Sequence, residues 1–213
     1  PFNPETFNID IELLESLLLG IKPKLITLGG SVFLFPHPIK QVAKICQDTG
    51  TIIHYDGSHV LGLIAGGEFS DPIKEGADIM MGSSHKTFPG PQGAILVTNN
   101  EKIFKKVQRG IFPELVSNHH LWRFPSLAVT LLEMKKHEKA YAQQTIKNAK
   151  KLAESLDQLG FEVMAKKYGF TESHQVVLDV SQHSGGFKAA VDLETSNIIC
   201  NKNLLYKDHV QNM

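Results

Sequence analysis

Four side chains with catalytic chemistry lie in two short runs of the sequence. Asp56 and His59 belong to HYDGSHVLGLIAGG (residues 54–67), and His85 and Lys86 belong to GSSHKTFPGPQGAIL (residues 82–96). Each run follows or ends an apolar stretch typical of a strand. Open α/β sheets bind their ligands at the carboxyl ends of the strands. We therefore expect a carboxylate, an imidazole and an amine at one edge of a sheet.

An amine and a carboxylate in such a place are what pyridoxal 5'-phosphate requires. A lysine amine binds its aldehyde as a Schiff base, which exchanges with the amine of an amino-acid substrate. A carboxylate keeps the pyridine nitrogen protonated, so that the ring accepts electrons from a bond broken at Cα. Without further context, Lys86 would more often be a solvated surface charge and Asp56 a turn residue before Gly57.

The two runs resemble those of the serine hydroxymethyltransferase family, which are close to VDMAHxAGLxAxG and TTTTHKTLxGPRGG. The agreement covers about a dozen identities in order and at matching spacing, which is far more specific than one short motif. The resemblance implies a three-layer αβα fold of the aspartate aminotransferase type (fold type I). It also implies a homodimer that interconverts serine and glycine with a folate one-carbon carrier, tetrahydrofolate, as the candidate co-substrate.

The resemblance also implies roles for individual residues. Lys86, Asp56 and His59 are the expected catalytic residues, and they would contact the cofactor's aldehyde, pyridine nitrogen and ring. Ser31, Ser84 and His85 match positions that hold the cofactor, and Asn203 in Asn201-Lys202-Asn203 matches a position near the folate pterin.

One loop departs from the family pattern and keeps alternatives open. The family has a loop close to FPGxQGGP, whose glycines approach the neighbouring subunit's phosphate, whereas residues 112–120 here read FPELVSNHH. Side chains there would obstruct a close backbone approach. His119 and His120 are candidate replacements that reach phosphate or substrate carboxylate. A metal site is disfavoured because no carboxylate or cysteine accompanies them at ligand spacing.

The departure, with Gln92 in place of the arginine of GPRGG, favours a folate-independent aldolase or transaldolase as the first alternative. An aminotransferase fits the motifs less well. A non-catalytic fragment that associates with a partner is the alternative from another class. The chain opens on Pro1-Phe2-Asn3-Pro4, typical of a loop inside a longer protein. The resemblance starts after the family's N-terminal third and stops before its substrate-binding arginine. We therefore expect this chain alone to be incomplete as a catalyst.

Composition excludes several classes of protein. The chain has 213 residues and is 42% apolar, enough for a substantial core. Its 22 basic and 22 acidic residues balance, which argues against nucleic acid or an anionic membrane as a partner. Two cysteines make no disulfide framework, and no apolar run approaches membrane-spanning length. These features favour a cytoplasmic protein.

The remaining pattern alternates strands and helices, as in parallel sheets with crossover helices. Asp10 is the expected N-cap of a helix that ends at Gly20, and Pro38 lies in the first turn of the next. We expect residues 1–137 to form part of the cofactor-binding large domain, and residues 138–213 a linking helix and part of a small domain. The expected strands are residues 24–30 (buried on both faces), 51–56, 78–84, 94–98, 161–165, 175–180 and 198–200; further helices are expected over residues 99–108, from 126 to 159, and near 187–194.

Overall fold

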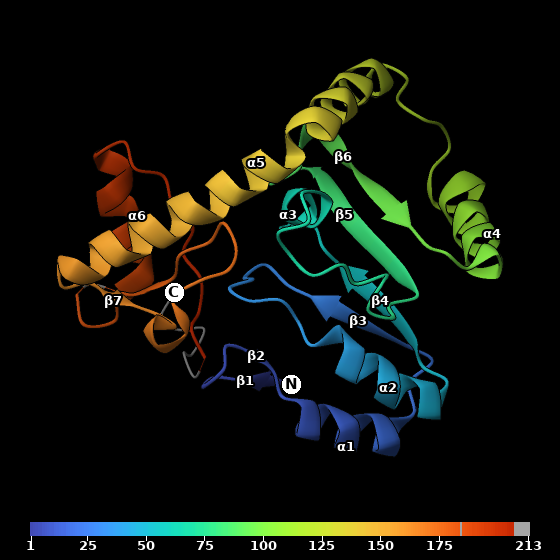
Figure 1. Cartoon of the computed structure of the whole chain (residues 1–213), viewed down its shortest axis with the longest axis horizontal. Coiled ribbons are helices and arrows are strands. Elements are labelled where there is room, and N and C mark those ends of the chain that lie inside the picture. The colour runs from blue at the N-terminus through green and yellow to red at the C-terminus, as the bar shows by residue number, and fades with distance from the viewer. Residues whose placement is uncertain (184, 207–213) are drawn as a thin grey trace.

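Four strands form the central sheet of the computed structural model, which describes residues 1–183 and 185–206. Their order is β3 (Leu25–Gly29), β4 (Ile52–Asp56), β5 (Ile79–His85) and β6 (Pro89–Val97) (Figure 1). β3, β4 and β5 are parallel, as the alternating pattern predicted, and β6 is antiparallel to β5. β6 is longer than the predicted strand because it forms a hairpin with β5. Lys86 lies in the turn of this hairpin.

Two helices precede and follow β3. α1 (Ile11–Ile21) begins at Asp10, whose Oδ1 accepts a hydrogen bond from the backbone N–H of Leu13 at 2.9 Å, as predicted. The predicted end at Gly20 is wrong: the helix continues to Ile21, and Lys22 caps it in a left-handed conformation. Pro23 follows and cannot continue the helix, which fixes the end there. α2 (Ile39–Thr49) begins after Pro38 and ends at Gly50.

The core lies on one face of the sheet. Both parallel crossovers advance in the same direction across the sheet, and right-handed crossovers then place α2 and α3 (Leu61–Ala65) on the same side. Ile53 and Tyr55 of β4 are buried against these helices, while His54 between them bonds the Thr27 hydroxyl in an exposed position. The prediction that residues 24–30 are buried on both faces is therefore wrong. β3 is the edge strand of the described sheet, and Leu25 is 48% exposed.

One long helix connects the sheet to the C-terminal part of the chain. α5 (Arg123–Gln158) packs on β6 and α3 and then runs away from the sheet (Figure 1). A Cβ at Gly66 would lie 2.6 Å from the carbonyl oxygen of Glu138, so glycine permits the close crossing of α3 and α5. α4 (Glu101–Arg109) and a short helical turn (Gly110–Leu115) precede α5. The predicted boundary at residue 137 falls inside α5, and the division into domains stays a prediction.

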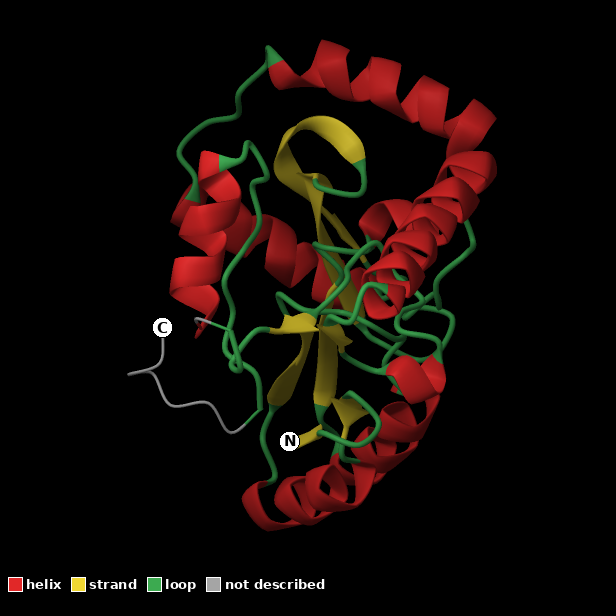
Figure 2. Ribbon diagram, turned by 90° about the vertical axis from the view of Figure 1, so that its left-hand side faces the viewer, coloured by secondary structure: helices red, strands yellow, loops and turns green. Residues whose placement is uncertain are grey.

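The C-terminal part contains two short strands and a helix: β7 (Glu162–Val163) pairs with β8 (Leu178–Asp179), and α6 (Gly185–Thr195) follows. The N-terminal hairpin of β1 (Phe2–Asn3) and β2 (Asn8–Ile9) lies close to this part in Figure 2, below the sheet. The strand predicted for residues 198–200 is wrong. These residues are irregular and exposed, Ile199 by 87%, and no strand among the described residues pairs with them.

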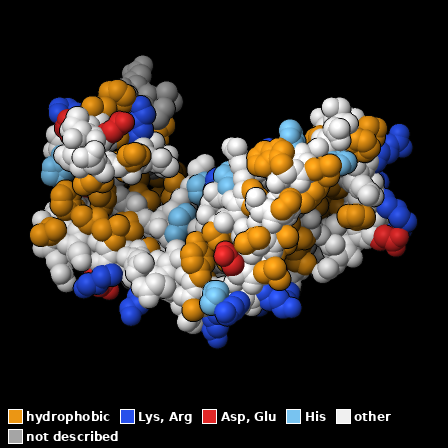
Figure 3. Space-filling view, turned by 90° about the horizontal axis from the view of Figure 1, so that it is seen from above, with side chains coloured by type: hydrophobic (Ala, Val, Ile, Leu, Met, Phe, Trp, Pro, Cys, Tyr) orange, Lys and Arg blue, Asp and Glu red, His pale blue; other side chains and the backbone are white. Residues whose placement is uncertain are grey.

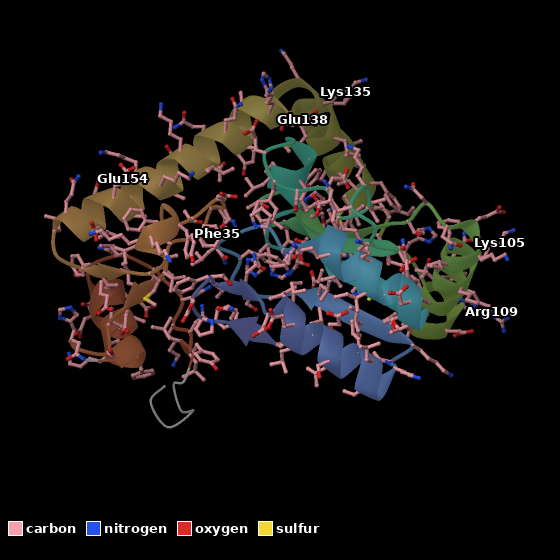
Figure 4. The ribbon with its side chains drawn as sticks, turned by 60° about the horizontal axis from the view of Figure 1, so that its bottom comes forward. Phe35, Lys105, Arg109, Lys135, Glu138 and Glu154 are labelled. Atoms are coloured by element: carbon pink, nitrogen blue, oxygen red, sulfur yellow. The ribbon has the colours of Figure 1, made fainter. Side chains whose placement is uncertain are left out.

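The C-terminal part also returns to the sheet. A one-turn 3₁₀ helix (Lys166–Tyr168) brings Tyr168 edge-on to Phe35, with ring centroids 6.0 Å apart. Figure 4 shows Phe35 between the sheet and this part of the chain. Figure 3 shows the hollow between the two parts, where pale blue histidine side chains gather. Over the part of the chain that the structure describes, no helix is long and apolar enough to cross a membrane.

Candidate functional site

Lys86 and His59 meet at the carboxyl edge of the sheet. The Lys86 Nζ lies 3.0 Å from the His59 Nε2, in an exposed position. His59 follows β4, and Lys86 follows β5, the neighbouring parallel strand. Two strands that run side by side in the same direction bring their ends together, as the sequence predicted. The pair can therefore share a proton between an imidazole and an amine.

Asp56 ends β4 beside this pair. Its Oδ1 accepts the backbone N–H of Ser58 at 2.9 Å, which shapes the turn that leads to His59. A Cβ on Gly29, at the end of β3, would collide with the backbone of Asp56, and Gly29 has φ +121°. Only glycine fits where the two strand ends approach this closely.

Burial and charge act together on His59. Burial lowers the pKa of His59, the nearby Lys86 charge lowers it further, and the Asp56 carboxylate opposes both effects. The imidazole is therefore neutral over a wider pH range than a free histidine. A neutral ring has one donor nitrogen and one acceptor nitrogen, so its neighbours decide which nitrogen carries the proton.

Thr87 anchors the turns that carry both residues. Its hydroxyl donates to the carbonyl oxygen of His59 at 2.7 Å and accepts the N–H of Gly62 at 3.1 Å. Its own carbonyl oxygen accepts the Tyr141 hydroxyl of α5 at 2.9 Å. The residue after Lys86 thus fixes the backbone of His59, which limits how far the pair can separate.

His174 and Gln175 complete the site, although no sequence motif pointed to them. The His174 ring stacks on His59 with centroids 6.0 Å apart and an interplanar angle of 12°. Gln175 Nε2 donates to the carbonyl oxygen of Ser31 at 2.8 Å and lies 3.5 Å from the His59 Nδ1. Ser31 therefore joins the cluster through Gln175. No motif singled out this segment, because only its return to the sheet creates the contacts.

Ser84 and His85 face the hairpin that carries Lys86. The buried Ser84 hydroxyl donates to the carbonyl oxygen of Pro91 at 2.6 Å. The N–H of Gly93 donates to the His85 Nδ1 at 3.3 Å. Both side chains thus hold the two strands of the hairpin together next to Lys86. Their expected contacts with a cofactor stay predictions.

The remaining predicted site residues lie elsewhere. His119 and His120 are exposed and lie in ring contact with Phe124 and Trp122. Asn203 is exposed in the irregular C-terminal stretch. Among the described residues, no hydrogen bond or ring contact joins these three to the Lys86–His59 pair. Their expected roles in binding substrate stay predictions.

The donor set of the cluster fits pyridoxal phosphate. Lys86 supplies an exposed amine for an aldehyde, and Asp56 supplies a carboxylate for a pyridine nitrogen. His59 supplies a flat ring beside Lys86, and the Ser31 loop borders the same edge through Gln175.

Comparison with a solved structure defines the class of protein. The crystal structure of L-threonine transaldolase from Pseudomonas fluorescens in the internal aldimine state matches with a TM-score of 0.83 and 33% sequence identity. The match covers 91% of this chain and 43% of that one. The chain therefore has the α/β fold of the pyridoxal-phosphate-dependent transferases, with a mixed sheet, and the predicted fold class is confirmed.

The family follows from the sequence comparisons. The serine hydroxymethyltransferase family model matches residues 1–213, so this chain belongs to that family, as predicted. Serine hydroxymethyltransferase from Sulfolobus acidocaldarius is 51% identical over 208 residues, which are 98% of this chain and 48% of that protein. The Staphylothermus marinus enzyme is 50% identical over 96% of this chain and 47% of its own length. The chain spans about half the length of the curated relatives it matches.

Proposed function

We propose that the protein containing this chain is a pyridoxal-phosphate-dependent enzyme that interconverts serine and glycine with a folate one-carbon carrier. The observation that carries the proposal is the 3.0 Å approach of the Lys86 amine to His59, beside Asp56, at the carboxyl edge of the sheet. Family membership over the whole chain and about 50% identity to named serine hydroxymethyltransferases support it.

Each residue of the site has a distinct task in this proposal. When bound, the cofactor supplies an electron sink for the bond to Cα that is made or broken. Lys86 binds the aldehyde, and Asp56 holds a proton at the pyridine nitrogen. His59 would lie beside the ring, and it can exchange a proton with the free Lys86 amine, whose Nζ is 3.0 Å from its Nε2. Thr87 keeps His59 and Lys86 at that separation through the His59 carbonyl oxygen.

The wider assignments belong to the same proposal. Asn203 contacts the folate pterin, and Ser31, Ser84 and His85 border the cofactor. His119 or His120 reaches the cofactor phosphate or the substrate carboxylate in a homodimer. Both histidines can donate hydrogen bonds from exposed rings, which suits an anion. The protein acts in the cytoplasm on small amino-acid substrates.

A folate-independent transaldolase is the second candidate. The similarity to the L-threonine transaldolase structure favours it, and so does the altered loop at residues 112–120. The higher identity to hydroxymethyltransferases, over nearly the whole chain, ranks the folate-dependent reaction first.

The test is glycine formation from L-serine by the full-length protein, with and without tetrahydrofolate. We expect tetrahydrofolate-dependent turnover that disappears in Lys86→Ala and persists in Lys102→Ala, a change at an exposed lysine of α4. Serine cleavage that is independent of tetrahydrofolate, together with aldehyde exchange on L-threonine, would support the transaldolase. No reaction on either amino acid would contradict both candidates.

A further inference from the structure

Residues 171–175 form a strap that ties the C-terminal part to the loop after β3. The backbone N–H of Glu172 donates to the Leu34 carbonyl oxygen at 2.7 Å. Inside the strap, the buried hydroxyls of Thr171 and Ser173 bond to the carbonyl oxygens of Leu34 and Phe33. These hydrogen bonds join the strap to the Phe33 and Leu34 carbonyl oxygens within the chain itself, so they need no bound ligand. The strap therefore delivers His174 and Gln175 to a fixed position above His59.

The orientation of the Gln175 amide is determined by its two backbone partners. The N–H of Phe33 donates at 2.6 Å, so the atom that faces it is the acceptor oxygen Oε1. The Ser31 carbonyl oxygen is an acceptor, so the atom that faces it at 2.8 Å is the donor Nε2. A flipped amide would place its N–H donors against the Phe33 N–H and its oxygen against the Ser31 carbonyl oxygen. The group that faces the His59 Nδ1 at 3.5 Å is therefore an N–H donor.

A donor next to Nδ1 selects the tautomer of His59. If Nδ1 carried the proton, two N–H groups would point at each other in a partly buried place. If Nε2 carries it, Nδ1 accepts from Gln175, and the Nε2–H points at the Lys86 Nζ. An N–H can donate to an amine only when that amine is neutral, because an ammonium group has no acceptor lone pair. A charged Lys86 would instead donate to a bare Nε2, which places the His59 proton on Nδ1 against the Gln175 N–H, so Gln175 opposes the charged form.

We propose that Gln175 is a positioning residue that holds His59 in the Nε2–H tautomer and thereby favours the neutral, nucleophilic form of the Lys86 amine. This inference rests on the proposed function in one respect, which is that the Lys86 amine binds the cofactor aldehyde. It stands on the two backbone hydrogen bonds of Gln175 and the contacts on both sides of the His59 ring.

The charged and titratable groups around His59 come from three parts of the chain. Asp56 precedes it on β4, Lys86 faces it from the β5–β6 turn, and His174 stacks on it from the strap. Burial first, and then His59 and Lys86, lower the pKa of His174 to about 4, so this neighbour is neutral near pH 7. The tautomer of His59 is thus set by hydrogen bonds and not by a charge from His174.

The direct test is the tautomer of His59 in the full-length protein freed of cofactor. A two-bond ¹⁵N–¹H spectrum of histidine-labelled protein near pH 8 distinguishes a protonated ring nitrogen from a bare one, and His59→Gln assigns the signal. We expect the proton on Nε2 in the parent protein and on Nδ1 in Gln175→Glu, because a carboxylate accepts. Gln158→Glu, the same charge change at the exposed end of α5, should leave it on Nε2.

The consequence for Lys86 is measured on the same cofactor-free protein by acetylation with limiting acetic anhydride and peptide mass spectrometry. Relative to exposed Lys102, labelling of Lys86 should fall about tenfold in Gln175→Glu, the ratio expected for one reversed charge-assisted hydrogen bond. Gln175→Met keeps the side-chain length but removes the amide without adding a charge. It should give a mixture of His59 tautomers and a smaller fall in Lys86 labelling. An Nδ1–H tautomer in the parent, an unchanged tautomer in Gln175→Glu, or unchanged labelling in both variants would overturn the inference. None of these readouts requires turnover, so they stand apart from the proposed function.

Discussion

Acid should unfold this protein partly through His37. The His37 ring packs on Phe33 in a tilted arrangement with centroids 4.6 Å apart, and it meets Tyr55 edge-on at 6.0 Å. Its Nδ1 is buried with no hydrogen-bond partner among the described residues. This burial lowers the pKa of His37 from 6.5 to about 4. A proton on the buried ring would be an uncompensated charge, which the folded state resists.

The sign and size follow from that shift. Because the pKa is lower in the folded state, the unfolded chain takes up the proton first as pH falls through 6.5. The stabilisation is complete above that value and is lost as pH falls to about 4. The full effect is about 3 kcal/mol, and about 2 kcal/mol of it is lost between pH 7.5 and pH 5.

The assay is urea unfolding of the cofactor-free protein at pH 7.5 and pH 5, for the parent and for His37→Phe. Phenylalanine keeps the aromatic packing and cannot titrate, so the loss of unfolding free energy between the two pH values should be smaller by about 2 kcal/mol. His137→Phe changes an exposed histidine of α5 and should behave like the parent. An equal loss in His37→Phe and the parent would refute the reasoning.

Two further predictions concern the site. Asp56→Asn should still bind pyridoxal phosphate but lose about 10²–10⁴-fold in turnover, because a neutral amide does not hold the pyridine proton. Steady-state kinetics with saturating cofactor measure the loss of turnover. Near-parental turnover would show that Asp56 only shapes the turn after β4. Tyr141→Phe removes the 2.9 Å hydrogen bond to the Thr87 carbonyl oxygen, and should lower the unfolding free energy by about 1 kcal/mol. Urea unfolding at pH 7.5 checks this change, and an unchanged midpoint would show that the bond adds no stability.

The sequence predicted the parts of the fold that depend on local pattern. Parallel strands with crossover helices place Asp56, His59 and Lys86 at one edge, so their common location follows from strand ends and spacing, while their expected roles came from the family resemblance. The helix cap at Asp10 follows equally directly from residue type. The predictions that were wrong concern burial and strand pairing, which depend on the tertiary surroundings of a segment. The burial of β3 depends on which helices cover each face, and in the part of the chain that the structure describes no strand pairs with residues 198–200.

Gln175 illustrates what local pattern cannot supply. It is 116 residues from His59 in the chain, and its region was predicted only as a strand of a small domain. Its importance comes from the strap that returns to the Ser31–Phe33 loop, and from the amide orientation that these backbone groups impose. Neither feature has a signature in residue type or spacing.

The central claim is that Lys86 is the amine that binds the cofactor. The most direct measurement is borohydride reduction of the full-length protein with pyridoxal phosphate, followed by peptide mapping. We expect a visible absorbance band that borohydride removes, and a single pyridoxyl adduct on Lys86, with none in Lys86→Arg. An adduct on another lysine, or the same adduct pattern in Lys86→Arg, would contradict it.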